Sequence, residues 1–138
     1  MHLKLKKNDE FVSIYEVDGF IEEFCSVVDE SQSTEPPPRY LKWLSGKLAV
    51  LDDKKEKAII LRDFEDLKET ITIDNTQYRI YSIRYPRSQI NPRVLYTIHE
   101  DEIIILLCSF QESKGRQDYR KAIARAKSIL GMIDKEEG

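Results

Sequence analysis

The sequence predicts an α+β fold, in which two helices near the N-terminus and one helix near the C-terminus flank a small antiparallel sheet. Three observations predict it: two amphipathic helical patterns come first, several apolar stretches of strand length follow, and a helical pattern with one apolar stripe ends the chain. The 138 residues suffice for one domain with its own core. They contain no internal repeat and no evident boundary, so we expect a single domain over residues 1–138.

The N-terminal part is expected to contribute one strand and two helices. Residues 11–17, FVSIYEV, are rich in β-branched and aromatic side chains and predict a first strand or an extended arm, with residues 1–17 as an N-terminal extension. Asp18 can cap a helix, because apolar residues then recur at helical spacing: Phe20, Ile21, Phe24, Cys25 and Val28. Beyond a polar loop at residues 29–38, a second amphipathic helix is expected from about residue 39 to residue 51, with one buried face: Tyr40, Leu44, Leu48 and Leu51.

Residues 58–108, in the middle of the chain, predict mainly strands. Residues 58–70 fit a strand or a short helix equally well. Residues 70–74 and 78–85 then predict a strand, a turn and a second strand. Residues 94–99 and 103–108 predict another antiparallel pair across a short charged turn, and the six consecutive apolar residues of the latter indicate a central strand.

The last element is an amphipathic helix. Its apolar stripe recurs at helical spacing: Tyr119, Ala122, Ile123, Ala126, Leu130 and Ile133. The opposite face is basic: Arg120, Lys121, Arg125 and Lys127. Gly131 lies where a left-handed helix cap is common, and we expect residues 132–138 to form a flexible tail.

The charges are unevenly distributed along the chain, whose net charge is −3. Residues 1–78 contain 11 Lys and Arg against 17 Asp and Glu, whereas residues 79–130 contain 10 against 5. A partner meets one face of a protein rather than its average charge. The basic C-terminal half is therefore compatible with nucleic acid, although the total charge alone argues against it.

The sequence favours the cytoplasm. No stretch approaches the roughly 18 consecutive apolar residues of a membrane span, and the N-terminal lysines precede no apolar core of a signal peptide. Cys25 and Cys108 lie in apolar surroundings without a Cys or His partner nearby, which favours buried free thiols over a disulfide. We therefore expect a cytoplasmic protein with no membrane partner.

The usual catalytic motifs are absent from the sequence, which contains no P-loop, glycine-rich dinucleotide motif, zinc-protease motif or serine elbow. We expect neither a metal nor a cofactor.

The remaining candidates for a functional site are basic and phenolic side chains: Arg79, Arg84, Arg87, Arg93, Lys114, Arg116, Tyr119 and Arg120. Because residues two apart on a strand share a face, neighbouring strands could bring Arg84 and Arg93 together. The same set could instead be a solvated surface with scattered salt bridges.

The order of these pieces resembles a toxin family. YSIRY in one strand, PRVLY in the next and IIILLCSF in the third are followed by a basic loop and the helix YRKAIARAK. This succession is similar to the RelE/ParE toxin superfamily, in its HigB-like, phage-derived Gp49-like branch. The similarity covers roughly residues 60–131, and it implies a RelE-like fold with the two preceding helices as an N-terminal hairpin.

The resemblance implies the toxin of a type II toxin–antitoxin system, a ribosome-dependent mRNA endonuclease that uses the 2′-hydroxyl of the RNA as nucleophile and needs no metal. Its implied partners are an antitoxin, of helix-turn-helix type, and mRNA on the ribosome. Arginines can stabilise the negative charge of the phosphate transition state, and a phenol can transfer a proton.

Positions in the family pattern imply roles for individual residues. Arg93 opens the RVLY strand and Arg84 ends the strand before it, so both are candidates for catalytic phosphate contact. Tyr119 stands where RelE-type toxins carry a catalytic tyrosine, although it also begins the apolar stripe of its helix. The implied RNA-binding residues are Arg79, Arg87, Lys114, Arg116 and Arg120.

The sequence departs from the family pattern at one place. Gln111 and Glu112 stand where the pattern has two lysines, and a glutamate beside a phosphate site repels the substrate. A second hypothesis follows: a non-catalytic RelE/ParE-like module that binds an antitoxin or another protein target, such as gyrase, without cutting RNA.

Overall fold

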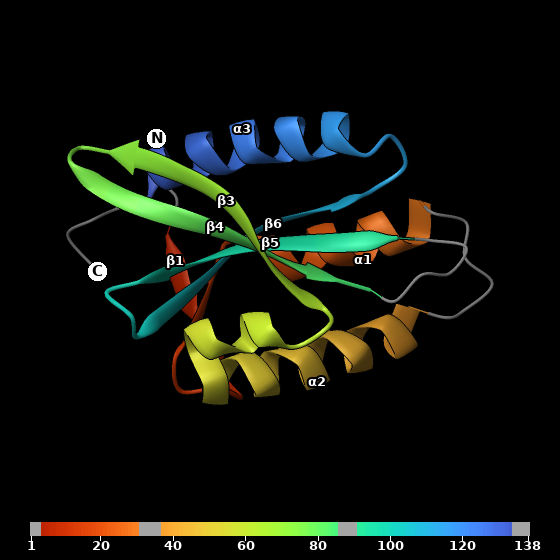
Figure 1. The fold of residues 1–138 in the computed structure, drawn as a ribbon. Coiled ribbons are helices and arrows are strands. Elements are labelled where there is room, and N and C mark those ends of the chain that lie inside the picture. The colour runs from red at the N-terminus through yellow and green to blue at the C-terminus, as the bar shows by residue number, and fades with distance from the viewer. Residues whose placement is uncertain (1–3, 31–36, 86–90, 134–138) are drawn as a thin grey trace.

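A six-stranded mixed sheet forms the centre of the protein, and three α-helices pack around it (Figure 1). The structure is a computed structural model that describes residues 4–30, 37–85 and 91–133. The elements in chain order are β1 Leu5–Lys7, β2 Ile14–Val17, α1 Phe20–Glu30, α2 Pro37–Lys54, the 3₁₀ helix η1 Lys55–Ile60, β3 Phe64–Ile73, β4 Thr76–Arg84, β5 Pro92–His99, β6 Ile103–Gln111 and α3 Arg116–Met132. The predicted α+β class is confirmed.

The strand order is β1-β2-β6-β5-β4-β3, which corrects two expectations. The sheet is mixed rather than antiparallel, because β2 runs parallel to β6 while the other neighbours are antiparallel. The two helices also follow the first strands instead of opening the chain. The physical reason is that β6 is almost entirely apolar and is buried when a strand lies on each side of it. β2 provides the second neighbour, and its fully buried Ile14 lies opposite Ile104 of β6. Residues expected to form an extension are thus part of the sheet.

The helices cover the sheet with the apolar faces that the sequence predicts. Phe20, Phe24 and Val28 of α1 are buried, and so is the predicted face of α2: Tyr40, Leu44, Leu48 and Leu51. In Figure 1, α3 lies on one side of the sheet and α2 on the other. None of the helices in the described ranges is long and apolar enough to cross a membrane.

The ambiguous stretch at residues 58–70 divides into two elements. Its first part ends η1, where Ala58 is buried, and its second part forms most of β3. β3 lies at the end of the strand order and carries a bulge, because its register against β4 shifts between Asp66 and Glu69. Charged residues and a bulge are common at sheet edges, where they discourage pairing with other chains.

A candidate binding cleft between α3 and β3

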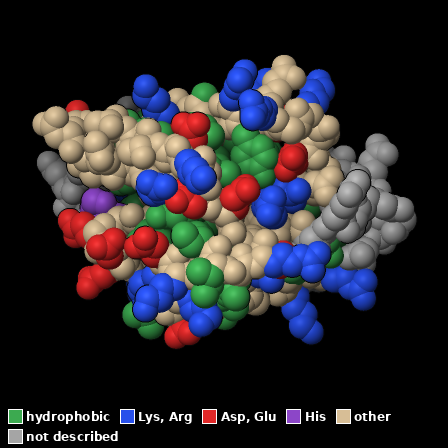
Figure 2. All heavy atoms as spheres, in the orientation of Figure 1, with side chains coloured by type: hydrophobic (Ala, Val, Ile, Leu, Met, Phe, Trp, Pro, Cys, Tyr) green, Lys and Arg blue, Asp and Glu red, His purple; other side chains and the backbone are tan. Residues whose placement is uncertain are grey.

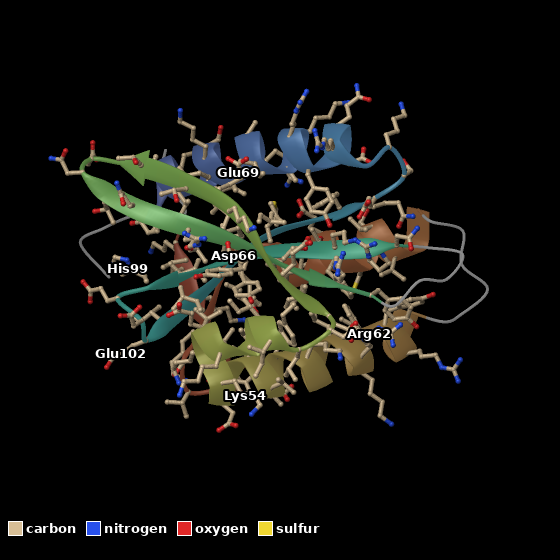
Figure 3. All side chains as sticks on the ribbon, in the orientation of Figure 1. Lys54, Arg62, Asp66, Glu69, His99 and Glu102 are labelled. Atoms are coloured by element: carbon tan, nitrogen blue, oxygen red, sulfur yellow. The ribbon has the colours of Figure 1, made fainter. Side chains whose placement is uncertain are left out.

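An open cleft of about 370 Å³ lies between the N-terminal half of α3 and the bulged part of β3. Its lining combines two arginines, a phenol, a carboxylate and two apolar side chains: Arg116, Arg120, Tyr119, Glu69, Leu67 and Ile123. Figure 3 shows Glu69 on the part of β3 next to α3. Three of the lining residues, Arg116, Tyr119 and Arg120, belong to the set predicted from the sequence.

The bulge in β3 shapes one wall of this cleft. Lys68 has a positive φ of 59°, and its N–H donates a hydrogen bond to Asp66 Oδ1 at 2.9 Å. Leu67 and Lys68 therefore stand outside the regular ladder with β4. A bulge turns a side chain away from its usual direction, and Leu67 here joins the cleft lining.

Tyr119 of α3 is part of the lining of the cleft. Its ring meets Phe110 edge to face, with centroids 5.1 Å apart. Burial raises the pKa of the phenol; Ser82 and Arg93 oppose this shift, and Glu112 adds to it. The phenol therefore stays protonated at neutral pH and acts as a hydrogen-bond donor rather than a base.

Arg93 lies beside Tyr119 but is already neutralised. The residue is only 9% exposed, and its Nε donates to Glu112 Oε1 at 2.8 Å. Its Nη1 donates to the carbonyl oxygens of Tyr85 and Pro92, both at 3.2 Å. This explains why an arginine opens an apolar strand: Glu112, the residue that departs from the family pattern, is its counter-ion.

Two of the other predicted arginines are also paired. Arg84 lies opposite Arg93 in the ladder, as predicted, and its Nη1 is 3.8 Å from Glu65 Oε2. Arg79 donates from Nε and Nη2 to Asp66, at 2.7 to 3.0 Å, and these hydrogen bonds lower the pKa of Asp66. Strand alternation places Arg79 on the opposite face of β4 from Arg84, away from the cleft.

Three exposed cations lie at and just before the N-terminal end of α3. Lys114, Arg116 and Arg120 are exposed, and none of them has an ion pair within the part of the chain that the structure describes. Asp118 accepts hydrogen bonds from the N–H groups of Lys114 and Ser113, which lower its pKa and fold the loop onto the helix. Figure 2 shows Lys and Arg side chains along the α3 edge of the molecule.

The structure therefore separates the predicted site into parts. Tyr119, Arg116 and Arg120 share one cleft, Arg84 and Arg93 lie nearby on the sheet with acidic partners, and Arg79 lies on the other face. Arg87 falls outside the described residues. The sequence interpretation missed Leu67 and Glu69; the charged run around them, DFEDLKET, is the signal of a bulged edge strand that could have revealed them.

Among the described residues, a metal site would draw on His, Cys, Asp and Glu side chains, and a reactive thiol on Cys25 or Cys108. Within residues 4–30, 37–85 and 91–133, no three His, Cys, Asp or Glu side chains gather in a group that could hold a metal ion. Cys25 and Cys108 are free, as predicted. Burial raises the pKa of the Cys108 thiol to about 12, so this thiol is unreactive in the folded protein.

Comparison with protein-family models, with curated proteins and with solved structures gives no match.

Proposed function

We propose that the protein is a non-catalytic binding module of RelE/ParE-like type, which binds an antitoxin-like protein or another protein target without cutting RNA. The observation that carries this proposal is the pairing of Arg93 with Glu112 at 2.8 Å. Arg93 and Arg84 are the two residues for which the family resemblance implies contact with a reacting phosphate. Arg93 donates from Nε to a carboxylate and from Nη1 to two carbonyl groups, so its charge is already compensated inside the protein and is weaker as a stabiliser of developing phosphate charge.

The neighbouring groups support the same conclusion. Arg84 faces Glu65, so both arginines of the presumed catalytic pair have acidic neighbours. A phenol that served as general base would need a lowered pKa, whereas burial raises the pKa of Tyr119. Binding does not need these groups to be free, because Arg116 and Arg120 line the cleft and have no ion pair with another described residue.

A second candidate is the metal-independent, ribosome-dependent mRNA endonuclease that the family resemblance implies. One observation favours it: Tyr119, Arg116 and Arg120 line the same open cleft. On this reading the arginines hold the RNA backbone while its own 2′-hydroxyl attacks the phosphorus and loses its proton to water. The protonated phenol, as general acid, gives its proton to the leaving 5′-oxygen, and a 2′,3′-cyclic phosphate remains.

Induced expression in a bacterial host separates the two candidates. Wild type, Arg93→Ala and the double variant Arg116→Ala/Arg120→Ala are expressed, growth is followed, and primer extension is run on a translated message. The binding module leaves the message uncut in all three strains. Growth arrest with codon-spaced cuts in the wild type, relieved by either variant, would establish the endonuclease instead.

A further inference from the structure

The cleft between α3 and β3 combines unpaired positive charge with apolar walls and lies against a sheet edge. We propose that it binds an acidic peptide segment in extended conformation, with carboxylates on Arg116 and Arg120 and an apolar side chain between Leu67 and Ile123. This inference rests on the proposed binding function and names the chemistry of the partner.

Charge complementarity gives the first argument. The arginines of the sheet and of the middle of α3 have acidic neighbours inside the protein: Arg79 with Asp66, Arg84 with Glu65, Arg93 with Glu112 and Arg125 with Glu23. Arg116 and Arg120, one helical turn apart, have no such neighbour among the described residues. An arginine can hold a carboxylate through two parallel hydrogen bonds, so two acidic side chains of a peptide suit this pair.

The walls of the cleft favour a peptide over RNA. Leu67 and Ile123 are partly buried hydrophobic residues that line it together with Tyr119. They offer an apolar surface to an aliphatic side chain, which RNA does not possess. Glu69, also in the lining, repels a chain that carries a negative charge on every unit. A peptide can place a neutral or basic residue there and its acidic residues at the arginines.

The backbone of β3 supplies the third argument. β3 is the last strand in the sheet order, so the outer side of its backbone faces no further strand in the described part of the chain. Exposed edge groups can accept an extended peptide through main-chain hydrogen bonds, while neighbouring pockets select its side chains. The bulge limits such pairing to a short stretch, which suits a peptide segment better than a whole domain.

The test is a fluorescence anisotropy titration of the full-length protein. The probe is a fluorescein-labelled peptide of Glu, Leu and Ser residues; the comparison probes are the same peptide with every Glu replaced by Gln, and a labelled single-stranded RNA. We expect the acidic peptide to bind at least about tenfold more tightly than the Gln peptide. Arg116→Ala/Arg120→Ala should weaken its binding by about tenfold, whereas the exposed control Lys127→Ala on the same helix should leave it unchanged.

Three outcomes overturn the inference: equal or no binding of the two peptides, equal losses in Lys127→Ala and the double variant, or tighter binding of RNA that the double variant abolishes. Circular dichroism confirms that each variant is folded. The primer-extension assay tests the proposed function separately. Uncut message with no peptide binding refutes only the choice of partner, while cut message refutes the binding module itself.

Discussion

At the scale of single residues, Arg93 and Glu112 form an ion pair that compensates a buried positive charge on the sheet. Arg93 is almost fully buried, and a buried cation is tolerated only when a counter-charge and hydrogen-bond acceptors surround it. Glu112 supplies the counter-charge at Nε, and two backbone carbonyls accept hydrogen bonds from Nη1. Glu112, whose charge opposes RNA binding, therefore also stabilises Arg93 in its buried position.

Glu112→Gln should lower the free energy of unfolding by about 1–3 kcal/mol, because it leaves the buried guanidinium without its counter-ion. Urea unfolding measures the change. Glu65→Gln is the matched control: Glu65 and Arg84 are exposed and 3.8 Å apart, so this substitution should change stability by no more than about 0.5 kcal/mol. Equal effects of the two substitutions would show that Arg93 does not depend on Glu112.

The buried thiol of Cys108 predicts a loss of stability in mild alkali. Its pKa is raised to about 12 in the folded protein, whereas an unfolded chain titrates near about 8.5. The stabilising contribution is complete below about pH 8.5 and declines as the pH rises toward 12, by at most about 1.4 kcal/mol per unit. Urea unfolding at several pH values should show a shallower decline for Cys108→Ala than for wild type. Cys25→Ala is the control for loss of a thiol, and an unchanged slope in Cys108→Ala would contradict the prediction.

At the scale of elements, the bulge in β3 has a backbone requirement that a substitution can test. Lys68 has φ of 59°, a conformation in which glycine is unstrained and a β-branched residue is strained. Lys68→Gly should preserve or raise stability, whereas Lys68→Val should lower it by about 1–2 kcal/mol. Thermal unfolding reports both.

Thr70, two residues further along β3 in regular pairing with Arg79, provides the reverse control. There the glycine substitution should destabilise by about 1 kcal/mol and the valine substitution should be nearly neutral. If valine were tolerated better than glycine at both positions, the bulge would not persist in solution. The wall that Leu67 contributes to the cleft would then be lost as well.

Elements with a strong periodic signal could be predicted from the sequence, and the others could not. The apolar faces of α1, α2 and α3 and the β5–β6 hairpin follow from residue spacing alone. The parallel pairing of β2 with β6 joins segments almost 90 residues apart, and no local pattern specifies strand direction at that separation. Only one wall of the cleft could be predicted, for the same reason. Tyr119, Arg116 and Arg120 lie on one helix, whose spacing the sequence shows, whereas Leu67 and Glu69 line the cleft only because of the bulge in β3.

At the scale of the whole molecule, the acidic and basic parts of the chain neutralise one another across the fold. Counted along the sequence, residues 79–130 are basic, which suggests a basic face. In the folded protein, acidic residues from before residue 79 approach several of these cations: Asp66 meets Arg79, Glu65 meets Arg84 and Glu23 meets Arg125. Segment charge therefore overestimates the positive surface that residues 79–130 contribute.

This neutralisation predicts that RNA affinity can be increased by removing carboxylates on the α3 side of the sheet. Glu65→Gln/Glu112→Gln frees Arg84 and Arg93 to contact phosphates. We expect tighter binding of a single-stranded RNA at low salt, with the slope of log affinity against log salt steeper by about 1.4 for two added phosphate contacts. Anisotropy titrations over a range of salt concentrations measure both quantities.

The control carries the same charge change at the far end of the sheet. Glu100→Gln/Glu102→Gln alters the turn between β5 and β6, where Figure 3 labels His99 and Glu102. Net charge is the same in both variants, so a general electrostatic effect would tighten RNA binding equally in each. Tightening confined to Glu65→Gln/Glu112→Gln would show that the wild-type carboxylates hold the sheet arginines away from RNA, which is what a module that binds without cutting requires. No tightening in either variant would mean that Arg84 and Arg93 cannot reach a phosphate at all, and the nuclease reading would then have to rely on α3 alone.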